Sequence, residues 1–154
     1  MGAALAAALL VPTPTRTAPE WTVHFVDTKG APMSNVRVIE SWQFFAVDPL
    51  MRSRSATSDA SGSVHFPAET GWANLAQRMY GWAWAEADWF GHRHYGPVAF
   101  VVFAVPGYGE AMIRGPGGWK AENPGPLETT FVLAPCPTDP SAPGVVGCAT
   151  PPDR

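Results

Sequence analysis

Alternating apolar and polar positions run through most of the chain and predict strands. In WTVHFVD, the apolar residues Trp21, Val23 and Phe25 are separated by the polar residues Thr22 and His24. This period of two is typical of a strand with one buried face. The run PVAFVVFAVP is instead continuously apolar, which predicts a central strand buried on both faces. The other predicted strands, in chain order, are NVRVIESWQFFAV, GSVHFP, MYGWAWAEADWF and LETTFVLAP.

Short polar segments rich in glycine and proline separate these strands. Gly30 and Pro32 in TKGAP predict a turn, and Gly62 in TSDASGS predicts a second turn with a positive φ. DPLMRSRSAT is polar and is interpreted as a loop with a short strand, and ETGWANLAQ is the one credible short helix. The pattern therefore predicts an all-β fold, a seven- to eight-stranded antiparallel sandwich with at most one short helix.

Composition supports one folded domain of this class. The chain has 154 residues, of which 46% are apolar and 15% charged, with 15 glycines and 17 prolines. Few charges and many turn-forming residues favour strands over helices. The net charge of −3 argues against a nucleic-acid-binding protein, which needs a basic surface.

The two ends of the chain indicate an exported protein. MGAALAAALLV is too short to span a bilayer but suits the apolar part of a secretory signal. We therefore expect a signal-like segment and linker over residues 1–19, a sandwich domain over 20–135 and a proline-rich tail over 136–154. Membrane contact is expected only through an uncleaved N-terminal segment. Cys136 and Cys148 are the only cysteines, and they predict a disulfide formed in the periplasm or after secretion.

Three stretches carry a family resemblance. VDTKGAPMSNVRV, TSDASGSVHFP and the closing FVLAPC resemble the transthyretin-like and carboxypeptidase regulatory-like sandwich domains. The resemblance covers roughly residues 20 to 135. It implies a transthyretin-like sandwich, and domains of this kind are often non-catalytic modules that pack on a partner protein.

A catalytic branch of that superfamily supplies an alternative. Hydroxyisourate hydrolases are similar to this chain in a histidine near the first strand, an H-x-H pair followed by a proline before a buried strand, and a late arginine. The matching positions are His24, His92, His94 and Arg114. Pro116 stands where that family has a serine, and Ser63 stands where it has an arginine. The alternative is therefore a diverged hydrolase in which the histidines activate water.

Metal binding has a weaker basis in the sequence. Tyr80 lies twelve residues before His92, a spacing similar to that of intradiol dioxygenases, which hold iron. That family uses a second, upstream tyrosine, and no tyrosine precedes Tyr80. His92 and His94 alone could share one strand face and hold a divalent metal. We expect no cofactor and no bound iron.

The seven tryptophans suggest a binding surface. Trp82 and Trp84 share one parity of the predicted strand and, with Trp89, could form a flat platform for a protein partner or for sugar rings. The main expectation is thus an exported binding or accessory module without catalytic activity, which packs on a protein partner in the cell envelope.

Overall fold

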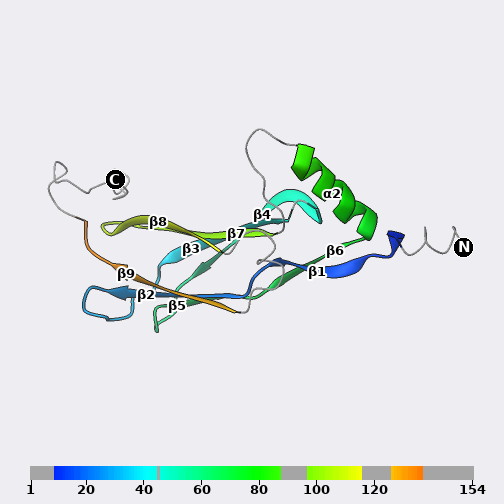
Figure 1. Cartoon of the computed structure of the whole chain (residues 1–154). Coiled ribbons are helices and arrows are strands. Elements are labelled where there is room, and N and C mark those ends of the chain that lie inside the picture. The colour runs from blue at the N-terminus through cyan, green and yellow to red at the C-terminus, as the bar shows by residue number, and fades with distance from the viewer. Residues whose placement is uncertain (1–8, 45, 88–96, 116–125, 137–154) are drawn as a thin grey trace, which may run out of the picture.

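Strands dominate the computed structural model, which describes residues 9–44, 46–87, 97–115 and 126–136. Within these ranges the chain forms nine strands and one helix, coloured in chain order in Figure 1. The elements are β1 (Thr13–Ala18), β2 (Trp21–Asp27), β3 (Arg37–Phe44), β4 (Asp48–Thr57), β5 (Ser63–Phe66), β6 (Glu69–Ala73), α2 (Leu75–Ala87), β7 (Val98–Val105), β8 (Gly109–Arg114) and β9 (Leu127–Leu133).

The strands form three sheets, with orders β1-β6, β5-β2-β9 and β4-β3-β7-β8. In Figure 1 the three-stranded sheet lies below the four-stranded sheet, and the β1-β6 ribbon extends to one side under α2. Most neighbours are antiparallel, as the sequence predicted. β2 and β9 are the exception, because they pair in parallel from Trp21↔Leu127 to Asp27↔Leu133. The prediction of a purely antiparallel arrangement is therefore wrong at this edge.

The two larger sheets share one apolar core. Val23 and Phe25 of β2 and Val101 and Phe103 of β7 are almost fully buried. The Phe25 and Phe103 rings meet edge to face with centroids 4.9 Å apart, which joins the two layers. The period of two in β2 is confirmed. For β7 the central position is confirmed, but burial on both faces is not, because its alternate positions are partly exposed.

The segment assigned to the linker contains a strand. Thr13–Ala18 forms β1 and pairs antiparallel with β6, and Ala18 is fully buried. The sequence pattern did not predict this strand because PTPTRTA contains prolines, and proline is normally restricted to edge strands. Whether a signal is removed stays a prediction. Among the described residues, no helix has the length and apolar character needed to cross a membrane.

Two further predictions about local structure are corrected. DPLMRSRSAT, predicted as a loop with a short strand, is a strand over its whole length: the ten-residue β4, paired along β3. The predicted strand at MYGWAWAEADWF is instead helical as far as Ala87, and the predicted helix at residues 69–77 begins later, after β6. Asn74 and Gln77 form a reciprocal cap at the helix start, in which each backbone N–H donates to the other side chain, at 2.9 and 2.8 Å.

The helix removes the reason for a shared tryptophan face. Residues two apart are separated by about 200° around a helix axis, whereas they share a face on a strand. The Trp82 and Trp84 backbones lie in α2. Their side chains, and Trp89, lie outside the described residues, so the binding role of these tryptophans stays a prediction.

The turn before β5 has the predicted conformation. Gly62 has φ +75°. The Asp59 carboxylate accepts hydrogen bonds from the Ser61 hydroxyl at 2.6 Å and from the backbone N–H groups of Ser61 and Ser63 at 2.8 and 3.0 Å. The Ser61 hydroxyl bond is the main reason that the pKa of Asp59 lies below its ordinary value.

The cysteine pairing remains a prediction with a direct test. Cys136 follows β9, and its backbone N–H donates to the Gly107 carbonyl at 2.7 Å, whereas Cys148 lies outside the described residues. We expect a Cys136–Cys148 bridge, because the pair closes a short proline-rich loop. The intact mass of protein isolated from the oxidising compartment should rise by two hydrogens on reduction. Alkylation of both thiols before reduction would contradict the bridge.

Candidate functional site

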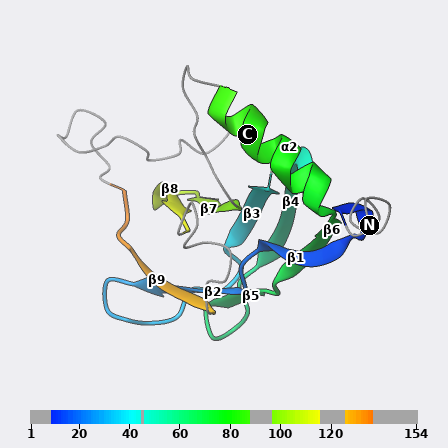
Figure 2. The same ribbon diagram turned by 45° about the vertical axis from the view of Figure 1, so that its right-hand side comes forward.

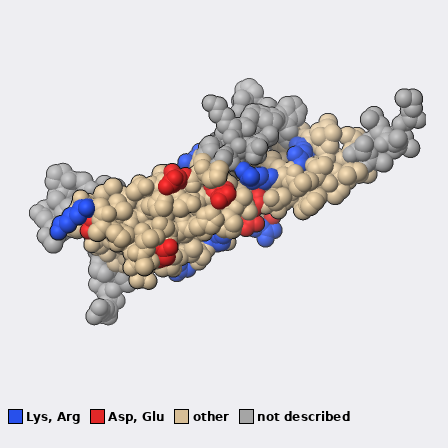
Figure 3. Space-filling model, turned by 90° about the horizontal axis from the view of Figure 1, so that it is seen from below, with Lys and Arg blue, Asp and Glu red and all other residues tan. Residues whose placement is uncertain are grey.

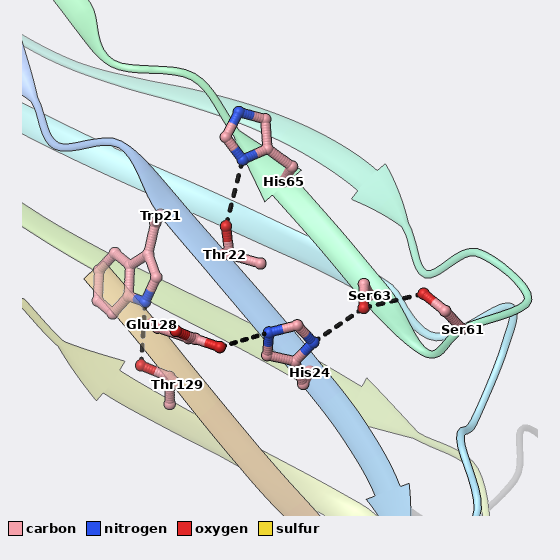
Figure 4. A network of polar contacts seen from close by, with 8 residues as sticks. All are labelled: Trp21, Thr22, His24, Ser61, Ser63, His65, Glu128 and Thr129. Atoms are coloured by element: carbon pink, nitrogen blue, oxygen red, sulfur yellow. Dashed lines mark hydrogen bonds and ion pairs between the residues drawn. The ribbon is translucent and has the colours of Figure 1, made fainter. Parts of the chain in front are cut away.

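A chain of polar contacts crosses the outer face of the three-stranded sheet (Figure 4). His24 of β2 lies opposite Ser63 of β5, and its Nδ1 is 2.8 Å from the Ser63 hydroxyl. On the other side, His24 Nε2 is 3.1 Å from Oε1 of Glu128 in β9. The Ser61 hydroxyl lies 3.0 Å from that of Ser63 and extends the chain of contacts into the turn. The alternation that buries Phe25 thus gathers these polar side chains on the opposite face.

This series contains a carboxylate, an imidazole and a hydroxyl, which are the groups of a base-activated nucleophile. The surroundings do not complete such a site. Glu128 is 76% exposed, so water screens its interaction with the imidazole. The backbone N–H groups of Ser61 and Ser63 both donate to Asp59, so neither is available to stabilise an oxyanion. The contacts tie β5, β2 and β9 together.

The residues of the hydrolase alternative are only partly described. His92, His94 and Pro116 lie outside the described residues. Arg114 is exposed at the end of β8, where it pairs with Phe100, whose side chain points away from the buried face of β7. His24 lies on the outer face of the other sheet. His24 and Arg114 are therefore on opposite sides of the shared core and do not converge.

A buried carboxylate on the other sheet was not identified from the sequence. Glu40 of β3 is fully buried, and its Oε2 accepts a hydrogen bond from Arg54 Nε at 2.6 Å. Arg54 also donates to Glu69 Oε1 at 2.6 Å and to the Pro67 carbonyl, and its guanidinium lies over the Trp42 ring. One arginine thus links β4 to β3 and to the segment that leads into β6.

Burial changes the titration of this group. Desolvation raises the pKa of Glu40 to about 7, and the attraction of Arg54 offsets it only in part. Glu40 Oε1 has no hydrogen-bond partner among the described residues. The sequence showed only one sign of this cluster, which was a glutamate at an inward position of a predicted strand. Arg54, the partner of Glu40, lies in a segment that was interpreted as mostly loop.

A pocket of about 260 Å³ lies beside this cluster. It is lined from β3, β4, β6 and the end of β1, and its lining includes Trp42, Arg52, Asp48, Glu69 and Thr17. Arg52 and Asp48 form an ion pair at 2.6 Å. The hydrogen bond from the Leu50 backbone N–H, followed by the hydrogen bond from Arg52, lowers the pKa of Asp48 below its ordinary value. Within the described ranges, no three His, Cys, Asp or Glu side chains lie close enough together to hold a metal ion.

Exposed apolar residues lie on the segments that meet around α2, although not all on one surface. We call this region the apolar end; α2 crosses above the β1-β6 ribbon there (Figure 2). Trp72 pairs with Pro14, so it points to the face of the β1-β6 ribbon opposite to Thr13 and Thr15, whose side chains contact α2. Trp72 is 64% exposed and Met79 59% exposed. Leu75 and Met79 are one helical turn apart and so lie on the same side of α2. The residues of the apolar end are Leu10, Val11, Trp72, Leu75 and Met79.

Charged side chains show no such grouping on the face seen in Figure 3. Lys, Arg, Asp and Glu lie interspersed among uncharged residues there. A surface that binds nucleic acid needs clustered basic residues, so this face offers none of the required electrostatic pattern.

Comparisons with known proteins do not show a family. No family model matches the chain, and no curated protein matches it. Among solved structures, the chain is similar to a 9R-lipoxygenase from Cyanothece PCC8801, with 12% sequence identity and a TM-score of 0.37. The match covers 82% of this chain but only 18% of the lipoxygenase. A likeness this weak supports no statement about function.

Proposed function

We propose that this chain is an exported, non-catalytic binding or accessory module of the transthyretin-like sandwich type, which binds a protein partner through the apolar end. The observation that carries the proposal is the exposure of Val11, Leu75 and Met79, of which Val11 and Leu75 line one pocket and Leu75 and Met79 share one side of α2. Isolated exposed apolar residues are ordinary, but a group contributed by two neighbouring segments favours an interaction site.

The residue types at the apolar end suit a protein interface. Tryptophan and methionine are enriched in interfaces, because they bury a large apolar area or adapt to an irregular surface. α2 and the β1-β6 ribbon lie outside the two-layer core, so a partner can contact them without disturbing it. The signal-like N-terminus and the cysteine pair support a partner in the cell envelope.

The alternative of a diverged hydroxyisourate hydrolase has less support. His24 is engaged by Ser63 and Glu128, and Arg114 lies on the opposite side of the molecule. Ring hydrolysis needs a base beside water and groups that fix the substrate. Among the described residues, His24 is a candidate base, but no groups that would hold the substrate in place lie around it.

The proposal is tested by photo-crosslinking in the native compartment. A benzoylphenylalanine replaces Trp72 or Met79, and a control carries it at Thr28, which is exposed in the β2–β3 turn far from the apolar end. We expect one defined adduct from positions 72 and 79 that contains a second, different protein. Leu75→Asp in the same chains should remove it. Adducts that are identical from position 28, or that contain only a second copy of this chain, would contradict the proposal.

A further inference from the structure

Arg78 of α2 is held in an unusual environment for a cation. Its Nη2 donates to the Thr13 hydroxyl at 2.9 Å and to the Thr15 hydroxyl, so the side chain reaches from the helix to β1. The reciprocal cap at Asn74 and the bond from the Arg78 backbone N–H to the Asn74 carbonyl fix the helical turn that carries it. The guanidinium is therefore positioned before any ligand binds.

The positive charge of Arg78 is not neutralised within the described part of the chain. No Asp or Glu described there forms an ion pair with it. Its Nε is buried and has no hydrogen-bond partner among those residues. Arginine keeps its charge at all ordinary pH values, and a hydroxyl partner does not compensate it. The lack of an ion pair within the described ranges leaves the guanidinium charge available to an anion, whereas the enclosed Nε does not face the pocket.

A pocket of about 480 Å³ adjoins this guanidinium. Its described lining is Val11, Thr13, Leu75 and Arg78. The volume falls within the range of small-molecule sites, about 300–1,000 Å³. The lining combines apolar side chains with one cation and one hydroxyl, and this combination favours a ligand with an apolar body and a single anionic group.

We propose that this pocket binds a small carboxylate that carries an apolar chain. The carboxylate pairs with Arg78, and the chain lies along Val11 and Leu75. The Thr13 hydroxyl, which donates to the Ala73 carbonyl at 3.3 Å, holds the guanidinium in place. Nη2 already donates to the two threonine hydroxyls and Nε is enclosed, so the carboxylate pairs with the remaining Nη1 group of the guanidinium. The pocket shares Val11 and Leu75 with the apolar end, whereas Trp72 and Met79 do not line it. The two proposals are tested separately, because binding of the carboxylate is measured without a partner protein.

The test compares octanoate with octylammonium, which carries the opposite charge, and with acetate, which lacks the long apolar chain. The full chain is titrated with each of the three by calorimetry and by backbone NMR. We expect octanoate to bind and to shift the signals of Thr13 and Leu75, with octylammonium and acetate at least tenfold weaker. Equal binding of octanoate and octylammonium would show that Arg78 plays no part and would overturn the proposal.

Variants assign the effect to the residue. Arg78→Gln should reduce octanoate affinity at least tenfold, and Arg52→Gln, in the other pocket, should leave it unchanged. If Arg78→Gln does not fold, Arg78→Lys decides: it keeps the charge, so octanoate must still bind better than octylammonium. Binding to vesicles that contain phosphatidylglycerol tests whether the anion belongs to a lipid surface. Binding to those vesicles without saturable binding of octanoate would also overturn the proposal that the pocket binds a small carboxylate.

Discussion

Replacing Gly62 with alanine is expected to lower the free energy of unfolding by about 3 kcal/mol. Gly62 has φ +75°, and a Cβ there would lie 2.5 Å from the Phe25 carbonyl oxygen and 3.0 Å from the Met33 nitrogen. Those backbone atoms cannot move independently. The Phe25 N–H donates to the Gly62 carbonyl at 2.8 Å, and the Met33 N–H donates to the Phe25 carbonyl at 2.9 Å. The substitution therefore disturbs β2 where it enters the core.

Gly30→Ala is the matched control. Gly30 also has a positive φ, +81°, but nothing lies within 4 Å of the position its Cβ would occupy. Its cost should be limited to the backbone conformation, about 1 kcal/mol. Urea unfolding of both variants, followed by tryptophan fluorescence, measures the difference. Equal losses would mean that the close approach to Phe25 and Met33 contributes nothing.

Replacing Arg54 with methionine is expected to cost about 3 kcal/mol at pH 8, because it leaves the buried Glu40 carboxylate without its cation. The loss should be smaller at pH 5, where Glu40 takes up a proton instead. Arg52→Met is the control, since Arg52 is an exposed partner of Asp48 and such pairs contribute less than about 1 kcal/mol. A loss for Arg54→Met that is independent of pH would contradict this account of Glu40.

The sign of the pH dependence follows from the pKa of Glu40. That pKa is about 7 in the folded chain, against 4.5 for an ordinary glutamate. Between these values the folded state holds a proton that the unfolded state has released, so stability from this group falls as pH rises. The full loss is about 3 kcal/mol and is complete above pH 7. Unfolding curves of the parent and of Glu40→Gln, measured from pH 4 to 8, should diverge by this amount.

The strands with a clear period were predictable, and those whose pattern was obscured were not. β2 and β5 alternate cleanly, and the turn glycine between β4 and β5 had a recognisable polar context. β4 was missed because its arginines and serines read as a loop. Its inward residue Arg54 is itself charged, and it is partly buried because Glu40 and Glu69 compensate its charge. No local pattern reveals such a long-range pair.

The helix and the parallel edge were missed for different reasons. MYGWAWA mixes alanine, a helix former, with aromatic residues that favour strands, so a short apolar run does not separate the two structures. The cap formed by Asn74 and Gln77 was a readable sign of a helix start. The direction of β9 carried no local signal, because parallel and antiparallel edges bury the same alternate residues. His24 was correctly placed on a polar face, but its contact with Glu128 depends on that direction.

The parallel pairing of β9 with β2 has a consequence for the order of events during synthesis. Phe131 of β9 stacks on Phe25 and meets Phe103, and Trp21 donates to the Thr129 hydroxyl at 3.0 Å. Until residues 127–133 have left the ribosome, one edge of β2 and part of this aromatic cluster have no cover. Contacts between distant segments form late, because closing a long loop costs entropy first. The nascent chain therefore cannot complete this core before β9 has been made, and it stays open to a chaperone until then.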